Sequence, residues 1–182
     1  MKNINRWGLM RNTHQENIEG HSLQVAMIAH ALVVIKNRRY GGNLNAERAA
    51  LLGIYHDATE ILTGDLPTPV KYYNPEIREA YQKVEDFAKD KLVSLLPEDL
   101  KQDFQGVFYP QEQDAELMPI IKAADRISAL IKCMEEKKAG NSEFSKAYEA
   151  QYAAIKKINT PEVNCFLEEF LPSFELTLDE QD

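Results

Sequence analysis

The stretch Leu52-Gly53-Ile54-Tyr55-His56-Asp57-Ala58-Thr59-Glu60 decides the fold, because it combines helical spacing of apolar residues with a His-Asp pair. We predict one helix over residues 46–62, with Asn45 as its N-cap. His56 falls on the apolar stripe, where an unpartnered imidazole is costly to bury, and Asp57 beside it needs a cation or an ion pair. A His-Asp step can also be a surface or capping pair, so the dipeptide alone is weak evidence for a metal.

The same helical periodicity recurs along most of the chain, whereas alternation with a period of two is almost absent. We therefore predict an all-α fold, a helical bundle that forms a single compact domain over residues 1–182, with an acidic tail that frays from about Asp179. Besides 46–62, helices are predicted over residues 20–36, from 75 until Pro97, over 114–139, and from 161 to about 171.

Two of these helices carry apolar stripes that we expect to be buried. In the first helix the stripe comprises Leu23, Val25, Ala26, Ile28, Ala29, Leu32 and Val33. The helix that follows Asn74-Pro75 is expected to be scaffold, with a stripe of Ile77, Tyr81, Val84, Phe87, Ala88, Leu92 and Leu95. Between Gly64 and Pro75, two prolines and a glycine predict an ordered loop without regular helix.

The composition, 44% hydrophobic and 27% charged, is that of an ordinary globular protein. Its net charge of -8 repels phosphate backbones, so long nucleic acids are excluded as partners, whereas a small anionic substrate is allowed. Cys133 and Cys165 lie outside any C-x-x-C pattern and are expected to be reduced thiols. The longest apolar stretch, residues 25–35, is too short to span a bilayer, so we expect a cytoplasmic protein with no membrane partner.

Two more polar residues fall at apolar places, His21 at the start of the first long helix and Asp125 inside a later stripe. Each has an ordinary alternative, since Asp125 could pair with a neighbouring cation and His21 could be exposed. Together with His56 and Asp57 they form a mixed nitrogen and oxygen set suited to Mn, Co, Fe or Zn. Four such ligands leave open positions in an octahedral shell, which indicates a catalytic metal.

Several motifs spread over nearly the whole chain carry a resemblance to a known family. They are Arg6-Trp7, His21-Ser22-Leu23-Gln24-Val25-Ala26, His56-Asp57-Ala58-Thr59-Glu60, Thr63-Gly64-Asp65-Leu66-Pro67-Thr68-Pro69-Val70-Lys71-Tyr72, Asn141-Ser142-Glu143-Phe144 and Pro172-Ser173-Phe174. In these motifs, and in its H...HD...D order, the sequence resembles the bacterial YfbR-like 5'-deoxynucleotidases, which are HD-domain phosphohydrolases. The resemblance implies an all-α fold, commonly a homodimer, that hydrolyses deoxyribonucleoside 5'-monophosphates with a divalent metal such as Co or Mn.

The resemblance also implies a role for each matching residue. The implied metal ligands are His21, His56, Asp57 and Asp125. The implied substrate contacts are Arg6, Trp7, His21, Asp57, Asp65, Leu66, Pro67 and Thr68. Arg6 would clamp the phosphate in catalysis, because a guanidinium can grip two phosphate oxygens, although from the sequence alone Arg6 and Trp7 could equally lie in a flexible N-terminus.

Glu60 is the implied catalytic carboxylate. It follows Asp57 by three residues and His56 by four, so on a continuous helix it would share their face and reach a metal-bound water without ligating the metal. The ordinary alternative is a surface glutamate. We expect the proton-relay role.

One departure from the family pattern precedes the first ligand. Relatives commonly have Glu there, whereas here Gly20 precedes His21 and the acid is displaced to Glu19, which bears on the outer hydrogen bonds that support the ligand. Two other functions remain open, an HD-type phosphohydrolase that acts on another nucleotide and a non-catalytic metal-containing helical binding protein. His14 and His30 are expected to be structural, His14 on a surface loop and His30 in a helix interface.

Overall fold

The computed structural model describes residues 1–71 and 73–180, and the regular structure there is helical, as predicted. The α-helices are α1 (Ile18–Arg39), α2 (Ala46–Tyr55), α3 (Glu60–Thr63), α4 (Thr68–Lys71), α5 (Pro75–Ser94), α6 (Lys101–Phe108), α7 (Met118–Lys138), α8 (Ser145–Ile158) and α9 (Pro161–Glu169). The 3-10 turns are η1 (Glu112–Asp114), η2 (Ser142–Phe144), η3 (Leu171–Glu175) and η4 (Leu178–Glu180). Within the described ranges, β pairing is limited to a bridge between Asn5 and Asn17.

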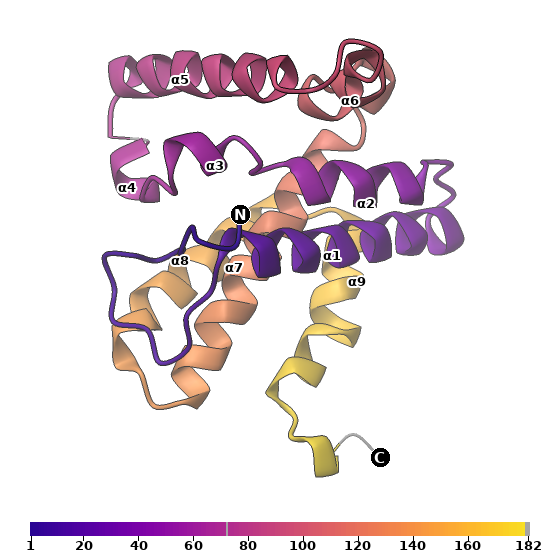
Figure 1. Cartoon of the computed structure of the whole chain (residues 1–182). Helices are drawn as coiled ribbons and strands as arrows, with labels where there is room; N and C mark the ends of the chain where they lie inside the picture. Colours follow the sequence, from indigo (N-terminus) through magenta and orange to yellow (C-terminus); the bar gives the residue numbers. More distant parts are fainter. Residues whose placement is uncertain (72, 181–182) are drawn as a thin grey trace.

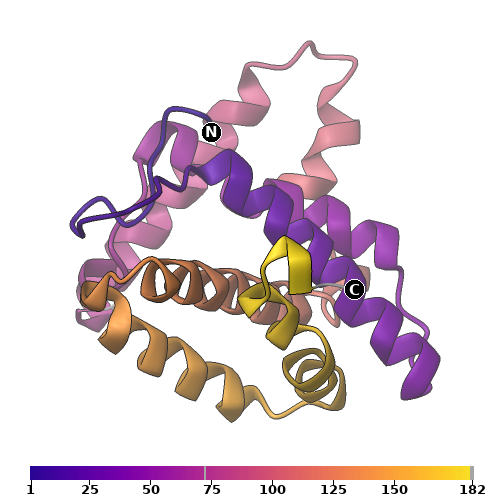
Figure 2. The same ribbon diagram turned by 90° about the horizontal axis from the view of Figure 1, so that it is seen from below.

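Helices α1 and α7 form the centre of the fold. Helix α2 packs along α1, while α8 lies beside α7 (Figures 1 and 2). The side chains between these helices are aliphatic and fully buried, and they include Val25, Leu32, Val33, Ile127, Leu130, Ile131 and Ile155. Their burial supplies the main driving force for folding, and it fixes α1 against α7 at the place where His21 and Asp125 project.

The contact between α1 and α2 is close because of one glycine. A Cβ atom on Gly53 would lie 2.8 Å from the Cα atom of Ala26, which is shorter than carbon atoms tolerate. Ala49 and Leu52 are buried on the same helix. The small residues Gly53 and Ala49 therefore let α2 pack closely on α1, which places the His-Asp pair near the start of α1.

The prediction of one continuous helix over 46–62 is wrong at the His-Asp pair itself. Helix α2 ends at Tyr55, residues 56–59 form a turn, and α3 starts at Glu60. In this turn the Glu60 amide donates to the carbonyl of Asp57 at 3.0 Å, which is an i to i−3 bond rather than the helical i to i−4 bond.

The side chain of His56 explains why the helix stops. Its Nδ1 atom lies 2.7 Å from the carbonyl oxygen of Gly53, the group that would accept the Asp57 amide in a continuing helix. The helix therefore ends where the imidazole takes over a backbone acceptor, a competition that apolar periodicity does not report.

Other element boundaries also differ from the predictions. Residues 64–75 include one helical turn, α4, with Pro69 near its start, where the missing amide is harmless. Helix α7 begins at Met118 rather than at 114, again with a proline in its first turn. Helices α6 and α8 were not predicted at all. At the C-terminus η4 includes Asp179, while residues 181–182 of the expected frayed tail lie outside the described residues.

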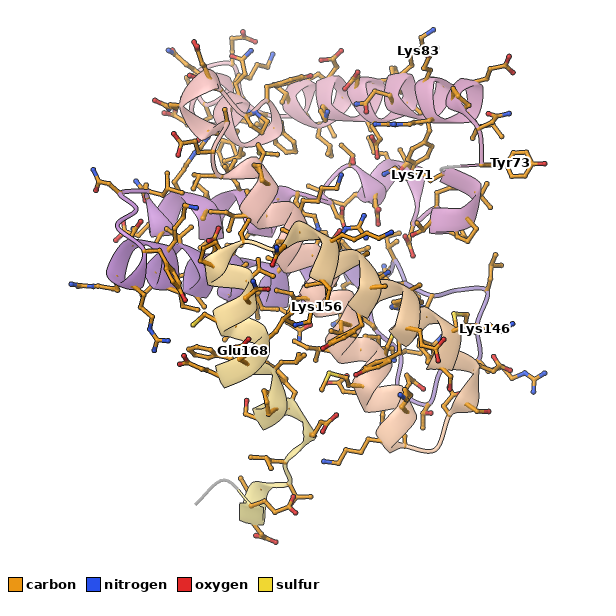
Figure 3. All side chains as sticks on the ribbon, turned by 180° about the vertical axis from the view of Figure 1, so that it is seen from behind. Lys71, Tyr73, Lys83, Lys146, Lys156 and Glu168 are labelled. Atoms are coloured by element: carbon orange, nitrogen blue, oxygen red, sulfur yellow. The ribbon has the colours of Figure 1, made fainter. Side chains whose placement is uncertain are left out.

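Helix α5 is not the buried scaffold that its stripe suggested. It lies apart from the central helices and contacts α3, α4 and α6 (Figure 1). Of its stripe only Ala88 is buried, whereas Phe87 and Leu95 are 69% and 66% exposed. Lys71 of α4 reaches towards α5 (Figure 3), and its Nζ atom lies 2.6 Å from the Glu85 carboxylate. The short helices α3 and α4 do not cover the apolar face of a helix of 20 residues.

Helix α1 is longer than predicted and is apolar on most sides. Among the helices of residues 1–71 and 73–180, it alone is long and apolar enough to cross a membrane, with a mean hydropathy of 1.5, but 56% of that window is buried inside the fold. Leu23 was expected in the core and is instead 59% exposed. His30 was expected in a helix interface and is also exposed, whereas His14 is exposed as predicted.

Candidate functional site

The four side chains predicted to bind metal meet at one place, although they come from three segments. The Nε2 atom of His21 lies 3.1 Å from Asp125 Oδ1 and 3.6 Å from Asp57 Oδ2. The Nε2 atom of His56 lies 3.1 Å from the same Asp57 oxygen. His21 is buried rather than exposed beside His14, and Asp125 pairs with His21 rather than with its own helix neighbours.

The histidines are oriented as ligands are in metalloproteins. Each uses Nδ1 for a contact within the protein, His21 with the Ser128 hydroxyl at 3.0 Å and His56 with the Gly53 carbonyl at 2.7 Å. Both Nε2 atoms are buried and have no hydrogen-bond partner in the described part of the chain. Buried polar atoms without partners are rare and costly, so two of them aimed at two carboxylates fit a divalent cation.

The hydrogen bonds around Ser128 define which nitrogen of His21 faces the site. The Ser128 hydroxyl donates to Gln24 Oε1 at 2.6 Å, so its lone pair accepts the proton on His21 Nδ1. The Nε2 atom then carries a lone pair towards Asp57 and Asp125. Gln24 and Ser128 therefore hold His21, the predicted ligand. This is the support that was expected from a Glu at the position of Gly20.

The electrostatics of the cluster favour bound positive charge. Burial alone would lower the pKa of His56, but Asp57, Asp125 and the Gly53 carbonyl raise it to about 9. Burial alone would raise the pKa of Asp57, yet His56, His21 and Arg6 hold it well below its ordinary value. Both shifts have one physical origin, because buried carboxylates lower their energy by keeping cations nearby.

Glu60 lies at the edge of this cluster as the first residue of α3. It is 8% exposed, so it is not a surface glutamate, but the turn after α2 removes the shared helical face that the sequence argument assumed. Burial, followed by the charges of Asp57 and Asp65, raises the pKa of Glu60 to about 8. Its Oε2 atom has no hydrogen-bond partner among residues 1–71 and 73–180. A carboxylate in this state suits proton transfer near neutral pH.

The N-terminal segment is ordered, which overturns the alternative of a flexible terminus. The Arg6 amide bonds the Glu16 carbonyl at 2.9 Å, beside the bridge of Asn5 to Asn17. The Arg6 Nη1 atom lies 3.3 Å from Asp57 Oδ2, so the guanidinium borders the cluster. Burial alone would lower the pKa of Arg6, but Glu16 and then Asp125, Asp57 and Asp65 raise it above its ordinary value.

The loop after α3 brings the other predicted substrate contacts towards Arg6. Asp65 is half-buried, and burial raises its pKa against the opposing effects of Arg6 and the Trp7 backbone amide. Leu66 and Pro67 are half-buried beside it, and Thr68 is exposed at the start of α4. Tyr72, the last residue of this motif, lies outside the described residues.

Three residues of the site were missed by sequence reasoning. Gln24 and Ser128 hold His21, and Glu16 contacts both Arg6 and Trp7. Gln24 stood inside a quoted motif, and as a polar residue in a mostly apolar helix it was available as a signal. Ser128 gave no signal, because its partners His21 and Gln24 lie on another helix far away in sequence. Glu16 gave none, because it lies in an irregular segment where helical spacing does not indicate contacts.

Comparisons with known proteins agree with this geometry. The family model for YfbR-like 5'-deoxynucleotidases matches residues 1–174. A 5'-deoxynucleotidase of Vibrio vulnificus is 53% identical over 180 residues, covering 99% of this chain and 93% of the relative. A 5'-deoxynucleotidase of Photorhabdus laumondii is 50% identical over 180 residues, covering 99% and 91%.

Solved structures share the fold. An HD-domain phosphohydrolase from Listeria innocua has a TM-score of 0.79 at 24% identity, covering 94% of this chain and 83% of that one. The cyanophage S-2L HD phosphohydrolase, bound to dA and one catalytic Zn2+ ion, has a TM-score of 0.64 at 20% identity, covering 96% and 92%. With the family model matching almost the whole chain and relatives of this similarity, the chain belongs to the YfbR-like family of 5'-deoxynucleotidases, within the HD-domain fold.

Proposed function

We propose that this protein is a metal-dependent phosphomonoesterase that converts deoxyribonucleoside 5'-monophosphates to deoxynucleosides and phosphate. The observation that carries the proposal is the convergence of His21, His56, Asp57 and Asp125, with Arg6 at the border of the cluster. Relatives about half identical over nearly their full length are named 5'-deoxynucleotidases. A solved HD phosphohydrolase of similar fold is bound to dA and one catalytic Zn2+ ion.

The two histidines and two aspartates would hold the divalent cation, and we propose Co or Mn. When bound, such a cation polarises a phosphate oxygen and lowers the pKa of a water molecule from roughly 16 towards about 7. The fit rests on His21 Nε2 and His56 Nε2, which face carboxylates and have no other partner among the described residues.

The protein's own side chains perform the remaining work. Arg6 would bind two oxygens of the phosphate and neutralise the charge that develops on them. Glu60 would accept the proton of the attacking water as the new bond to phosphorus forms. The bond between phosphorus and O5' then breaks, and Glu60 would relay the proton it accepted to O5', so that the deoxynucleoside leaves with a 5'-hydroxyl.

The sugar and base would lie between Trp7 and the loop that begins at Asp65. Asp65 would accept a hydrogen bond from a sugar hydroxyl, while Leu66, Pro67 and Thr68 would border the nucleoside. We propose Trp7 as the wall that crowds C2', so that a ribose hydroxyl finds neither room nor a partner. His21 and Asp57 would contact the phosphate as well as the cation.

The test is phosphate release from deoxynucleoside and ribonucleoside 5'-monophosphates after chelation and addition of single divalent ions. Activity should require the added ion and prefer the deoxynucleotides. Glu60→Gln should lower kcat by about 100-fold or more while metal content stays unchanged, and Glu79→Gln, an exposed acid on α5, is the matched control. Near-parental turnover of Glu60→Gln would contradict the proton-transfer role.

The same assay separates the alternative functions. Release from triphosphates, cyclic dinucleotides or alarmones, without release from monophosphates, would identify a different HD-type phosphohydrolase. Full metal loading without turnover on any nucleotide would identify a metal-containing binding protein.

We further propose that the protein is a cytoplasmic homodimer. Helix α1 exposes Leu23, Met27 and Val34 on one side, and α2, packed along it, exposes Leu51 and Ile54. We call these five residues the α1–α2 apolar face. A helix that is apolar on all sides is ordinarily covered, and an exposed cluster of large apolar residues indicates an interface. A second copy of the chain is the proposed cover.

A further inference from the structure

The segment before α1 is held by a buried polar network that the catalytic proposal does not use. Glu136 of α7 is fully buried, and its carboxylate accepts the amides of Thr13 and His14 at 2.9 to 3.1 Å. Lys132, also buried, pairs with Glu136 and donates to the His14 carbonyl. Burying such a pair is costly unless its hydrogen bonds are satisfied, so this arrangement serves to place the segment.

The Asn141-Ser142-Glu143-Phe144 motif, which had no assigned role, makes further contacts with the N-terminal segment. Asn141 Nδ2 donates to the Arg11 carbonyl at 2.7 Å and to Glu136 at 2.8 Å. The carboxylate of Glu143 accepts the Arg11 amide at 3.1 Å. The fully buried ring of Phe144 lies 5.3 Å from the ring of Trp7. In Figure 1 the N-terminal segment accordingly passes the turn between α7 and α8 before it enters α1.

Within this segment one carboxylate contacts both residues of the Arg6-Trp7 motif. The Oε2 atom of Glu16 accepts Arg6 Nε at 3.0 Å and Trp7 Nε1 at 3.0 Å. Because Glu16 engages Nε, the terminal nitrogens of Arg6 remain available on the side of the predicted metal ligands. Nη1 lies 3.3 Å from Asp57 Oδ2. The side chains of Glu16 and Arg6 are only 14% and 12% exposed, so water screens this contact weakly.

The backbone at Trp7 shows that the contact holds a strained conformation. Its φ of 59° lies in the left-handed region, which is unfavourable for a residue with a Cβ atom. A bulky residue stays there only when its surroundings fix it. The indole is fixed by Glu16 at its nitrogen and by Phe144 at its ring.

We infer that Glu16 is a positioning residue of the substrate site, which aims the guanidinium of Arg6 at the phosphate and locks the indole of Trp7 beside it. Glu16 itself does not touch the substrate. The inference rests on the proposed function, since it specifies how the phosphate of a deoxynucleotide is gripped. A preformed clamp lowers the cost of binding, so its loss should raise KM more than it lowers kcat.

The experiment compares Glu16→Ala and Glu16→Gln with Glu19→Gln, a matched loss of charge at an exposed position on the first turn of α1. For Glu16→Ala we expect kcat/KM for a deoxynucleotide to fall by about tenfold or more, chiefly through KM. Glu16→Gln keeps an acceptor oxygen without the charge, so its kcat/KM should lie between those of wild type and Glu16→Ala. Glu19→Gln should match wild type, and circular dichroism should show that all variants fold.

Trp7 provides a second readout, because it is the only tryptophan in the chain. In Glu16→Ala its emission should shift and its quenching by acrylamide should rise, whereas a purely structural role for Glu16 would change melting temperature without changing KM. If Glu16 acts largely through Arg6, the double variant Arg6→Ala with Glu16→Ala should lose clearly less than the sum of the two single losses, and the remaining loss should accompany the change in Trp7 quenching.

Parental KM and parental Trp7 quenching in Glu16→Ala would overturn the inference, and so would additive losses in the double variant. An unaltered protein that releases no phosphate from any deoxynucleotide would instead overturn the proposed function. In that case the comparison of Trp7 quenching alone decides whether Glu16 fixes the motif.

Discussion

His21 Nε2 on α1 lies 3.1 Å from Asp125 Oδ1 on α7, so the two central helices bring an imidazole to a carboxylate at the edge of their apolar contact. Burial alone would raise the pKa of Asp125, but the neighbouring imidazoles of His21 and His56 hold it below its ordinary value. The two imidazoles therefore keep the Asp125 carboxylate charged at the edge of the apolar core.

Asp125→Asn preserves the shape of the side chain and removes its charge. We expect the affinity for Mn2+ to fall by about tenfold to 100-fold or more, because that factor already applies to groups that only support a ligand. The rise in melting temperature on adding Mn2+ should shrink accordingly. Calorimetric titration of chelated protein measures this, with Asp103→Asn on the exposed side of α6 as the control. Equal affinities in the two variants would contradict the assignment of Asp125.

Ser128→Ala removes the acceptor that fixes the proton on His21 Nδ1. We expect Mn2+ affinity to fall by about 10-fold to 100-fold, with the fold intact. Ser22→Ala is a matched control, since Ser22 is buried beside His21 and its hydroxyl has no partner within the described chain. The idea fails if both alanine variants bind Mn2+ as the parent does.

The clustering of the four predicted ligands could be expected from the sequence because its members stand out singly. His56 and Asp57 are polar on an apolar helix, and His21 and Asp125 are polar in other apolar stripes, so their convergence follows once the helices share a core. The family resemblance added the order of the ligands. The ends of the helices were harder to predict, because the side chain of His56 competes for a backbone carbonyl that periodicity assigns to the helix.

The exposed residues and the supporting contacts could not be predicted. Leu23 and His30 were placed in the interior because a helix apolar on every side gives no preferred direction in its pattern, and only the packing of α2 and α7 selects the buried face. Ser128 acts through a partner distant in sequence, and Glu16 lies in an irregular segment before α1, so neither spacing nor composition indicates them.

Gly53→Ala tests the close approach of α2 to α1. The new Cβ atom would lie 2.8 Å from backbone of Ala26, so the helices must separate, and we expect a loss of about 1 to 3 kcal/mol in the free energy of unfolding. Gly106→Ala on α6 meets an arginine side-chain nitrogen at an ordinary 3.7 Å and should be neutral or stabilising. Denaturant unfolding compares them. Equal stabilities would show that α1 and α2 separate without cost.

Acid should release the N-terminal segment before it unfolds the core. Burial alone would raise the pKa of Glu136, but Lys132, the Thr13 amide and Asn141 hold it well below its ordinary value of 4.5. A lowered folded pKa gives stabilisation that is complete above the ordinary value and is lost as pH falls towards the folded pKa. Acrylamide quenching of Trp7 should therefore rise on acidification below about pH 4.

Glu136→Gln should remove this acid dependence, because the amide does not titrate and also binds the segment less firmly. Its Trp7 should be more accessible already at neutral pH, whereas Glu79→Gln on the exposed side of α5 should behave as wild type. If quenching of Trp7 followed global unfolding at every pH in both wild type and Glu136→Gln, Glu136 would not be what anchors the N-terminal segment.

Met27→Glu tests whether the α1–α2 apolar face joins two copies of the chain. Met27 is 66% exposed at the middle of that face, so a carboxylate there would be buried without a partner in a dimer and solvated in a monomer. We expect light scattering after size exclusion to give a dimer for wild type and a monomer for Met27→Glu. The matched control is Phe87→Glu on α5, because Phe87 is 69% exposed and equally apolar but lies on a different helix. A monomer only in Phe87→Glu would move the interface to α5, and a wild-type monomer would refute the dimer altogether.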